Sequence, residues 1–179
     1  MRAVRIEHSQ AAYFADFAFY FAAVVVLLGI LAGFAPRQDL PDVALAVMGG
    51  VLSWSLVEYL MHRLIFHGIE PFRRMHGEHH RRPQAWIATP TALSAAFILF
   101  LVWLPATLLG GVWLGLGATL GMTAGYFAYG LIHHAVHHWR ARGAWLRRRK
   151  RLHALHHHAA RCNYGVTTSL WDHVFRSFE

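Results

Sequence analysis

Histidine is the residue type in this chain whose number and spacing are best suited to chemistry. The sequence holds 15 histidines in 179 residues, and its long apolar stretches contain none. Ten of them form four clusters: His62 and His67; His76, His79 and His80; His133 and His137; and His153, His156 and His157. Imidazole is a common metal ligand, so this grouping predicts that several rings converge on metal ions.

The spacing within three clusters fits one face of a helix, because residues three and four apart lie on the same face. Each of these clusters can therefore offer two or three rings to one metal centre. The first cluster is different, since five residues turn an α-helix by about 500° and leave the two rings roughly 140° apart. His62 and His67 would serve different metals, flank the cluster, or lie where the helix ends and bends.

The number of rings predicts two metals, because ten imidazoles exceed what one tetrahedral or octahedral ion can bind. Imidazole suits iron, copper, zinc and nickel, so the ligand type alone does not name the metal. Cys162 is the only cysteine, which excludes a disulfide within the chain and a metal site built on several cysteines. The Glu-x-x-His signature of soluble di-iron helical bundles is also missing.

Carboxylates are expected around the ligands, because a ligating histidine usually donates its second ring N–H to a carboxylate or carbonyl. Glu58 lies four residues before His62 and is a candidate acceptor on the same helical face. Asp172 and Glu78 are further candidates, although both could equally pair with arginines. His173 fits an outer position or an ordinary surface residue. The histidines left out of the site are His8, His134, His138 and His158.

The composition indicates an integral membrane protein. The chain is 56% hydrophobic with a mean hydropathy of +0.32, which is too apolar for an ordinary soluble domain. Apolar stretches run over 17–34, 43–57, 92–109 and 112–132. About 20 residues cross a bilayer, and the short second stretch continues in a helical pattern to residue 66. We predict an all-α fold with four transmembrane helices in two hairpins, in a single domain over 1–179.

The basic residues predict the orientation. Arg37 is the only one of 17 lysines and arginines on the loops that join the two helices of each hairpin. The positive-inside rule then places both termini and the link between the hairpins in the cytoplasm. All four histidine clusters lie in those segments, so the metal site would form a cap on the cytoplasmic side. The N-terminal apolar stretch is interpreted as a retained membrane helix, because it lacks a clear cleavage site.

Shorter elements are expected outside the membrane. Short helices are predicted around 73–80 and over 145–160, the second amphipathic and interfacial, and the aromatic tail 163–179 should fold back onto the metal region. The basic run 147–151 suits anionic lipid headgroups, and nucleic-acid binding is not expected despite a pI near 10.6. Glycines at 117, 121 and 125 would let another helix approach closely. The residues that could line a substrate channel, or anchor the chain at the interface, are Trp54, Trp86, Tyr126, Tyr129, Tyr164 and Trp171.

The histidine motifs resemble those of a known family. They read H-x4-H at 62–67, H-x2-H-H at 76–80, H-x3-H-H at 133–138 and H-x2-H-H at 153–157, followed by Gly-Val-Thr and Trp-Asp within 165–172. Their order and spacing resemble the fatty acid hydroxylase superfamily, membrane di-iron enzymes that include fatty acid 2-hydroxylases, sterol desaturases and carotenoid hydroxylases. The resemblance covers about residues 50–178. One departure is Gly130, where several fatty acid 2-hydroxylases have Asp.

The resemblance implies the same ten histidines as ligands of two iron ions, with zinc able to replace iron in a purified sample. It implies dioxygen as co-substrate, a membrane lipid acyl chain as substrate, and hydroxylation as the reaction. Some relatives carry a cytochrome b-type haem domain before this region. We expect none here, and therefore a separate electron-transfer protein as partner. The sequence makes no prediction of the oligomeric state.

Three alternatives remain open. A sterol or carotenoid hydroxylase or desaturase of the same superfamily would differ only in its product. A metal-transport or other non-enzymatic metal-binding membrane protein would be expected to carry ionisable ligands inside its spans, which here are bare apart from Asp16 and Glu58 near their ends. A bis-histidine haem protein would place ligand pairs within facing helices. The sequence pattern disfavours the last two alternatives.

Overall fold

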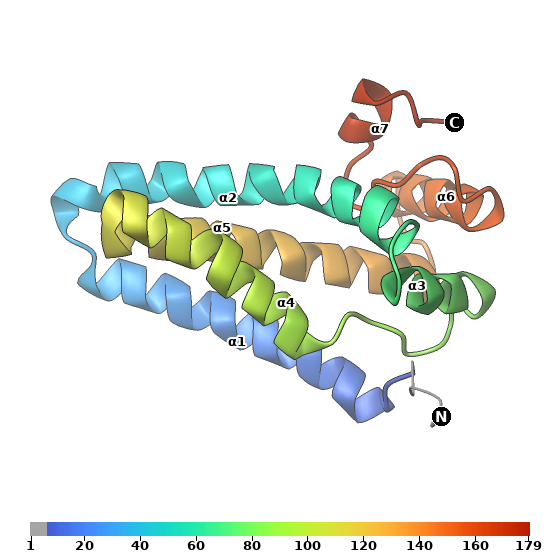
Figure 1. Cartoon of the computed structure of the whole chain (residues 1–179), viewed down its shortest axis with the longest axis horizontal. Helices are drawn as coiled ribbons and strands as arrows, with labels where there is room; N and C mark the ends of the chain where they lie inside the picture. The colour runs from blue at the N-terminus through green and yellow to red at the C-terminus, as the bar shows by residue number, and fades with distance from the viewer. Residues whose placement is uncertain (1–6) are drawn as a thin grey trace. The chain divides into compact units, whose positions relative to one another are not determined.

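The computed structural model describes residues 7–179, and this part of the chain contains helices and no strands (Figure 1). Arg2 and Arg5, which contribute to the predicted orientation, lie outside the described residues. In chain order, the elements are α1 (Gln10–Phe34), η1 (Arg37–Asp39), α2 (Leu40–Leu60), η2 (Met61–Phe66), α3 (Phe72–Arg81), α4 (Thr91–Ile98), η3 (Leu99–Trp103), α5 (Leu104–His138), α6 (Ala144–His158) and α7 (Leu170–Val174). The predicted all-α class is confirmed.

Among residues 7–179, three helices are long and apolar enough to cross a membrane: Gln10–Phe34, Arg37–Phe66 and Thr91–His138. The third is 48 residues long and contains both the third and the fourth predicted apolar stretch. Gly111 interrupts it with φ 83° and ψ 171°, a conformation that favours glycine. In Figure 1, α4 and the later part of α5 run in opposite directions. The membrane helices are confirmed, and the count of four crossings stays a prediction.

The chain divides into two compact units. One contains the described residues 7–13, 55–88 and 128–179, and the other contains 14–54 and 89–127. All ten predicted ligands belong to the first unit. The prediction of a single domain over 1–179 stays a prediction.

The second unit is built from apolar helices that pack through glycine. A Cβ added at Gly121 or Gly125 of α5 would collide with α2, at Val47 and Trp54 respectively, and one at Gly117 would make a tight contact with Val43. This finding confirms that the glycine ladder admits a neighbouring helix. Leu31 of α1, Val43 of α2 and Leu120 of α5 form the buried core of this unit. Polar contacts also join α1 to α4, including a 2.6 Å hydrogen bond between the hydroxyls of Tyr20 and Ser94.

The first unit contains η2, α3, α6 and α7. α3 and α6 lie within two residues of the predicted helices 73–80 and 145–160, a difference smaller than the usual uncertainty of helix ends. The tail also folds back as expected, because the backbone of residues 162–167 contacts side chains of α2, η2 and α6. Four short elements were not foreseen: η1, η2, η3 and α7. η2 is a π-helix of six residues that follows α2 directly.

Candidate metal centre

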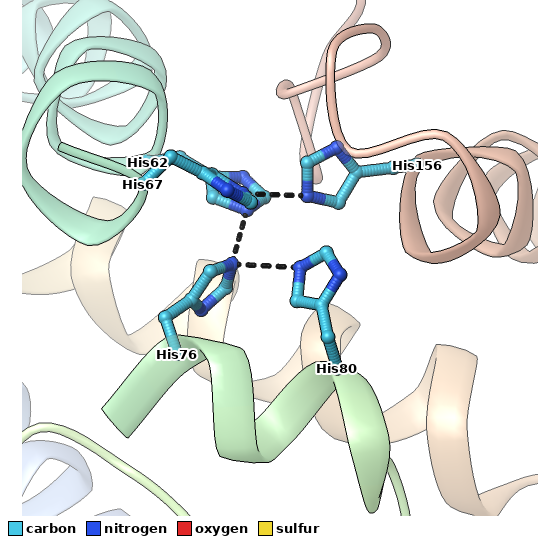
Figure 2. A group of neighbouring side chains, drawn as sticks. All are labelled: His62, His67, His76, His80 and His156. Atoms are coloured by element: carbon cyan, nitrogen blue, oxygen red, sulfur yellow. Dashed lines mark hydrogen bonds between the residues drawn. The ribbon is translucent and has the colours of Figure 1, made fainter. Parts of the chain in front are cut away.

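Nine of the ten predicted ligands form two groups whose nitrogen atoms lie within 4.8 Å of one another. The first, here the five-histidine group, is drawn in Figure 2 and contains His62, His67, His76, His80 and His156. The second, here the four-histidine group, contains His79, His133, His137 and His153. Two sets of converging rings match the prediction of two metals in number, with four or five nitrogens available to each.

The five-histidine group draws on three elements (Figure 2). His62 lies on η2 and His67 directly follows it, His76 and His80 come from α3, and His156 comes from α6. The Nε2 atoms face one another, at 2.9 Å between His62 and His76, 3.0 Å between His76 and His80, and 3.1 Å between His67 and His156.

The π-helix explains how His62 and His67 reach the same group. Its hydrogen bonds join residues five apart, so residues at that spacing lie on the same face. An ordinary α-helix would turn the two rings away from each other. Of the three arrangements open from the sequence, the structure therefore shows a helix whose geometry changes at its end.

The helical clusters do not each serve one centre. His76 and His80, four residues apart on α3, lie in one group, whereas His79 lies in the other. On α6, His153 and His156 are likewise in different groups. On both helices, the two histidines that are three residues apart therefore belong to different groups. They lie on opposite sides of the helix face that is turned toward the site. α3 and α6 each contribute to both groups and hold them next to each other.

His157 is the tenth predicted ligand and lies outside both groups. Its Nε2 is 3.1 Å from Nε2 of His153, and its ring stacks on His80 with centroids 4.2 Å apart. It therefore contacts one member of each group. Its role as a ligand stays a prediction.

The rings outside the membrane-spanning helices are held neutral. Burial, reinforced by neighbouring imidazoles, lowers the pKa of His79 to about 2 and that of His156 to about 3. The same causes lower the pKa of His67 and His157 to about 4. A neutral imidazole has one nitrogen with a free lone pair, which is the form that binds a metal.

The ring nitrogens of these histidines are suited to bind a cation. Both nitrogens of the buried His79 lack a hydrogen-bond partner among the described residues, and an unpaired buried polar group costs about 1–3 kcal/mol. His62 donates its Nδ1 hydrogen to the carbonyl of Tyr164 at 2.5 Å, and His156 donates to that of Cys162 at 2.8 Å. These carbonyls can only accept, so both rings must present an Nε2 lone pair to the centre.

Of the predicted supporting residues, Glu58 and Asp172 are buried next to the site. Glu58 does not accept from His62, which corrects the expectation from spacing, because both nitrogens of His62 face other partners. The oxygens of Glu58 instead accept the N–H groups of Val166 and Thr167, at 2.7 and 2.9 Å. Asp172 is fully buried and accepts the N–H groups of Tyr164 and Gly165, at 2.8 and 2.9 Å.

The other two supporting candidates lie elsewhere. Glu78 forms ion pairs with Arg81 and Arg82, as the sequence analysis allowed. The hydrogen bond from Arg81 is the main cause that lowers the pKa of the Glu78 carboxyl. His173 is exposed and stacks on Phe178 with centroids 4.0 Å apart.

The predicted channel aromatics divide between the two units. In the first, the ring of Tyr164 contacts His62, His67 and His156, and Tyr129 stacks on His133. Trp86 stacks on His138, and Trp171 donates to Ser55 at 3.0 Å. In the second unit, Trp54 and Tyr126 meet edge to face at 5.2 Å. Tyr164 and Tyr129 are thus the two that border candidate ligands, and a channel stays a prediction.

Sequence reasoning missed the backbone acceptors. The carbonyls of Cys162 and Tyr164 carry no signal in the amino-acid sequence, because any residue supplies one. Ser177, which donates to Asp172 at 2.9 Å, also gave no signal. The histidines left out of the site have other contacts: His134 with Tyr13, His138 with Trp86, and His8 with the carbonyl of Ala88. His158 is exposed on α6.

Known proteins resemble this chain in fold and in sequence. The solved structure of full-length Scs7p, in which only the hydroxylase domain is visible, superposes with a TM-score of 0.80 at 22% identity, over 94% of this chain and 67% of that chain. A dihydroceramide fatty acyl 2-hydroxylase of Arabidopsis thaliana is 33% identical over 146 residues, which cover 75% of this chain and 61% of that protein. A ceramide very long chain fatty acid hydroxylase of Schizosaccharomyces pombe is 35% identical, over 70% of this chain and 40% of that protein.

This chain therefore spans about three fifths or less of the length of these two relatives. The family profile described as fatty acid hydroxylase matches residues 47–177, which include every candidate ligand. The chain belongs to the fatty acid hydroxylase family.

Proposed function

We propose that this protein is an oxygen-dependent hydroxylase of a membrane lipid acyl chain, with two iron ions held by the two histidine groups. The observation that carries the proposal is the pair of adjacent groups, which share α3 and α6 and consist of imidazole alone. Relatives named as acyl 2-hydroxylases support the reaction type.

In this proposal, the five- and four-histidine groups each hold one ion, and His157 completes the second set. The two metals would supply the activation of dioxygen for insertion into an unactivated C–H bond. One oxygen atom enters the acyl chain as a hydroxyl group, and the other leaves as water with two electrons and two protons from a donor. We propose a separate electron-transfer protein as that donor.

The protein's own contribution is to hold and shield the site. Burial keeps the rings neutral, so their lone pairs are available without competition from protons. The carbonyls of Cys162 and Tyr164 select the tautomer of two ligands. The rings of Tyr164 and Tyr129 cover the candidate ligands they contact, which would restrict access by water.

The topology is part of the proposal. We propose four crossings, with the reversal at Gly111 between the third and the fourth, and with both termini and the metal site in the cytoplasm. A substrate whose tail lies in the bilayer would then present its head-proximal carbons to a site at the membrane surface. The names of the relatives point to the acyl chain of a ceramide or dihydroceramide as the closest substrate class.

Lipid mass spectrometry of cells that express the chain tests this function. Wild-type cells are expected to contain lipids heavier by one oxygen, and these lipids should be absent with His156→Ala, which removes a ligand that is fully buried. His158→Ala, on the exposed side of the same helix, is the matched control and should retain the product. Lipids that lose two hydrogens would instead indicate a desaturase. Full activity of His156→Ala would contradict the proposed site.

A further inference from the structure

We infer that the two histidine groups are inequivalent metal sites, and that the C-terminal segment 162–177 makes the five-histidine group the tighter one. This inference rests on the proposed function, because it assumes that both groups hold metals. Asp172 and Glu58 act in it as positioning residues, which touch no metal and act through the backbone of the segment.

The segment contacts one group directly. The Tyr164 carbonyl accepts from Nδ1 of His62, and the Cys162 carbonyl accepts from Nδ1 of His156. Both rings belong to the five-histidine group, and both are almost completely buried. With Nδ1 held, each ring keeps its orientation and its Nε2 lone pair before any metal arrives.

Asp172 holds this stretch of backbone in place. Its carboxylate accepts three hydrogen bonds, from the N–H groups of Tyr164 and Gly165 and from the hydroxyl of Ser177 at 2.9 Å. A Cβ at Gly165 would collide with Thr168 and with the carboxylate, so the close approach requires glycine. The N–H of Gly165 and the carbonyl of Tyr164 belong to the same peptide group. The buried carboxylate of Asp172 therefore fixes the position of this carbonyl.

Glu58 holds the other side of the same stretch. Its oxygens accept the two N–H groups of Val166 and Thr167 and the hydroxyl of Thr167 at 2.6 Å. Because Glu58 lies on α2 four residues before His62, it ties the segment to the helix that leads directly into η2, which carries this ligand. The buried Arg149 of α6 adds a further link, since it donates to Ser169 at 2.6 Å.

Within residues 7–179, two of the four rings in the four-histidine group lack such an acceptor. Nδ1 of His153 and both nitrogens of His79 are buried without a hydrogen-bond partner in the part of the chain that the structure describes. No acceptor therefore fixes the tautomer of these two rings. Loss of such an outer acceptor typically lowers metal affinity about 10- to 100-fold, which sets the expected difference between the two groups.

Titration of the purified, chelator-stripped protein with Co²⁺, in competition with a chromophoric chelator, tests the inference. We expect two steps that differ in affinity about 10- to 100-fold. Two ligand variants assign the steps. His76→Ala should abolish the tight step, and His133→Ala should abolish the weak step, because each residue belongs to one group.

Asp172→Asn tests the positioning role, because it keeps the size of the side chain and removes an acceptor. The tight step should weaken about 10- to 100-fold while the weak step stays unchanged. Ser177→Ala removes one of the three bonds to Asp172 and serves as a milder variant, with a smaller loss in the same step. Glu78→Gln is the matched control, since this carboxylate pairs with surface arginines, and it should change neither step.

The outcomes separate the inference from the proposed function. If the wild type bound Co²⁺ at two sites of equal affinity, the inference alone would be overturned. The same conclusion would follow if Asp172→Asn or Ser177→Ala lowered the Co²⁺ affinity of both steps equally. A tight step unchanged in both variants would also overturn it. A wild type that binds no Co²⁺ would overturn the inference and the proposed function together.

Discussion

The surroundings of each histidine, more than its place in a motif, decide its chemistry. His156, His157 and His158 are consecutive on α6, yet the first is fully buried and bonded to a carbonyl, whereas the third is exposed. The helical period explains this difference, because consecutive residues are turned by about 100° around the axis. His134, His138 and His158, which were left out of the predicted site, lie outside the two groups, and so does the predicted ligand His157.

The lowered histidine pKa values predict an acid-sensitive apoprotein. The pKa values of His67 and His157 are about 4 in the folded chain, below the ordinary 6.5. Between these values the unfolded chain binds more protons than the folded chain, so stability is retained above pH 6.5 and falls as the pH falls toward 4. Thermal unfolding of the chelator-stripped protein in detergent should show a midpoint that decreases from pH 7 to pH 5. A midpoint constant over this range would contradict the burial of the neutral rings.

Not every side chain could be predicted at this scale. Glu58 was expected to accept from His62, because the two lie four apart, but its oxygens accept from a loop more than 100 residues later in the chain. Helical spacing describes neighbours along one element and carries no information about such long-range partners. The backbone acceptors of His62 and His156 escaped prediction for the same reason.

At the scale of elements, the π-helix η2 could not be predicted from the periodicity of the sequence. The H-x4-H spacing conflicts with an α-helical face, and this conflict was the only sign of a change in geometry. α3 and α6 were predicted to within two residues, but η1, η3 and α7 were not predicted, and α1 begins seven residues before the first apolar stretch, at Gln10. Hydrophobic pattern alone does not detect such polar helix ends.

The packing of α2 against α5 gives a prediction at this scale. Gly121→Ala would push a methyl group against the backbone of Val47 and Val51, and should destabilise the protein by about 1–3 kcal/mol through overpacking. The matched control is Gly29→Ala on α1, where a Cβ meets nothing within 4 Å. Thermal unfolding in detergent compares the two. Equal midpoints for both variants would show that the close helix approach does not matter.

For the whole molecule, composition was enough to predict an all-helical chain with helices long and apolar enough to cross a membrane. The division of the rings into two groups was not predictable, because it depends on how α3 and α6 face each other. The expectation of two metals came from a count of ligands, and it stays a prediction. The count of crossings rests on the reversal at Gly111, within a helix that is otherwise continuous.

The proposed topology predicts which positions can be labelled from outside the cell. Cys162 is the only cysteine and is 2% exposed, so the wild-type chain provides an unreactive background. A membrane-impermeant maleimide added to intact cells should label Gln38→Cys, in the loop of the first hairpin, and should not label Arg142→Cys before α6. Both positions are exposed, so both should react after the membrane is permeabilised. The reverse pattern would place the metal site on the outer side.

The central claim is that the two histidine groups together support transfer of oxygen from dioxygen to a lipid. Growth of expressing cells under isotopically heavy dioxygen, followed by mass spectrometry of the acyl chains, tests it most directly. The account predicts hydroxylated acyl chains that carry one heavy oxygen atom in wild-type cells, and none in cells with His79→Ala. Hydroxyl oxygen derived from water, or heavy product undiminished in the variant, would contradict it.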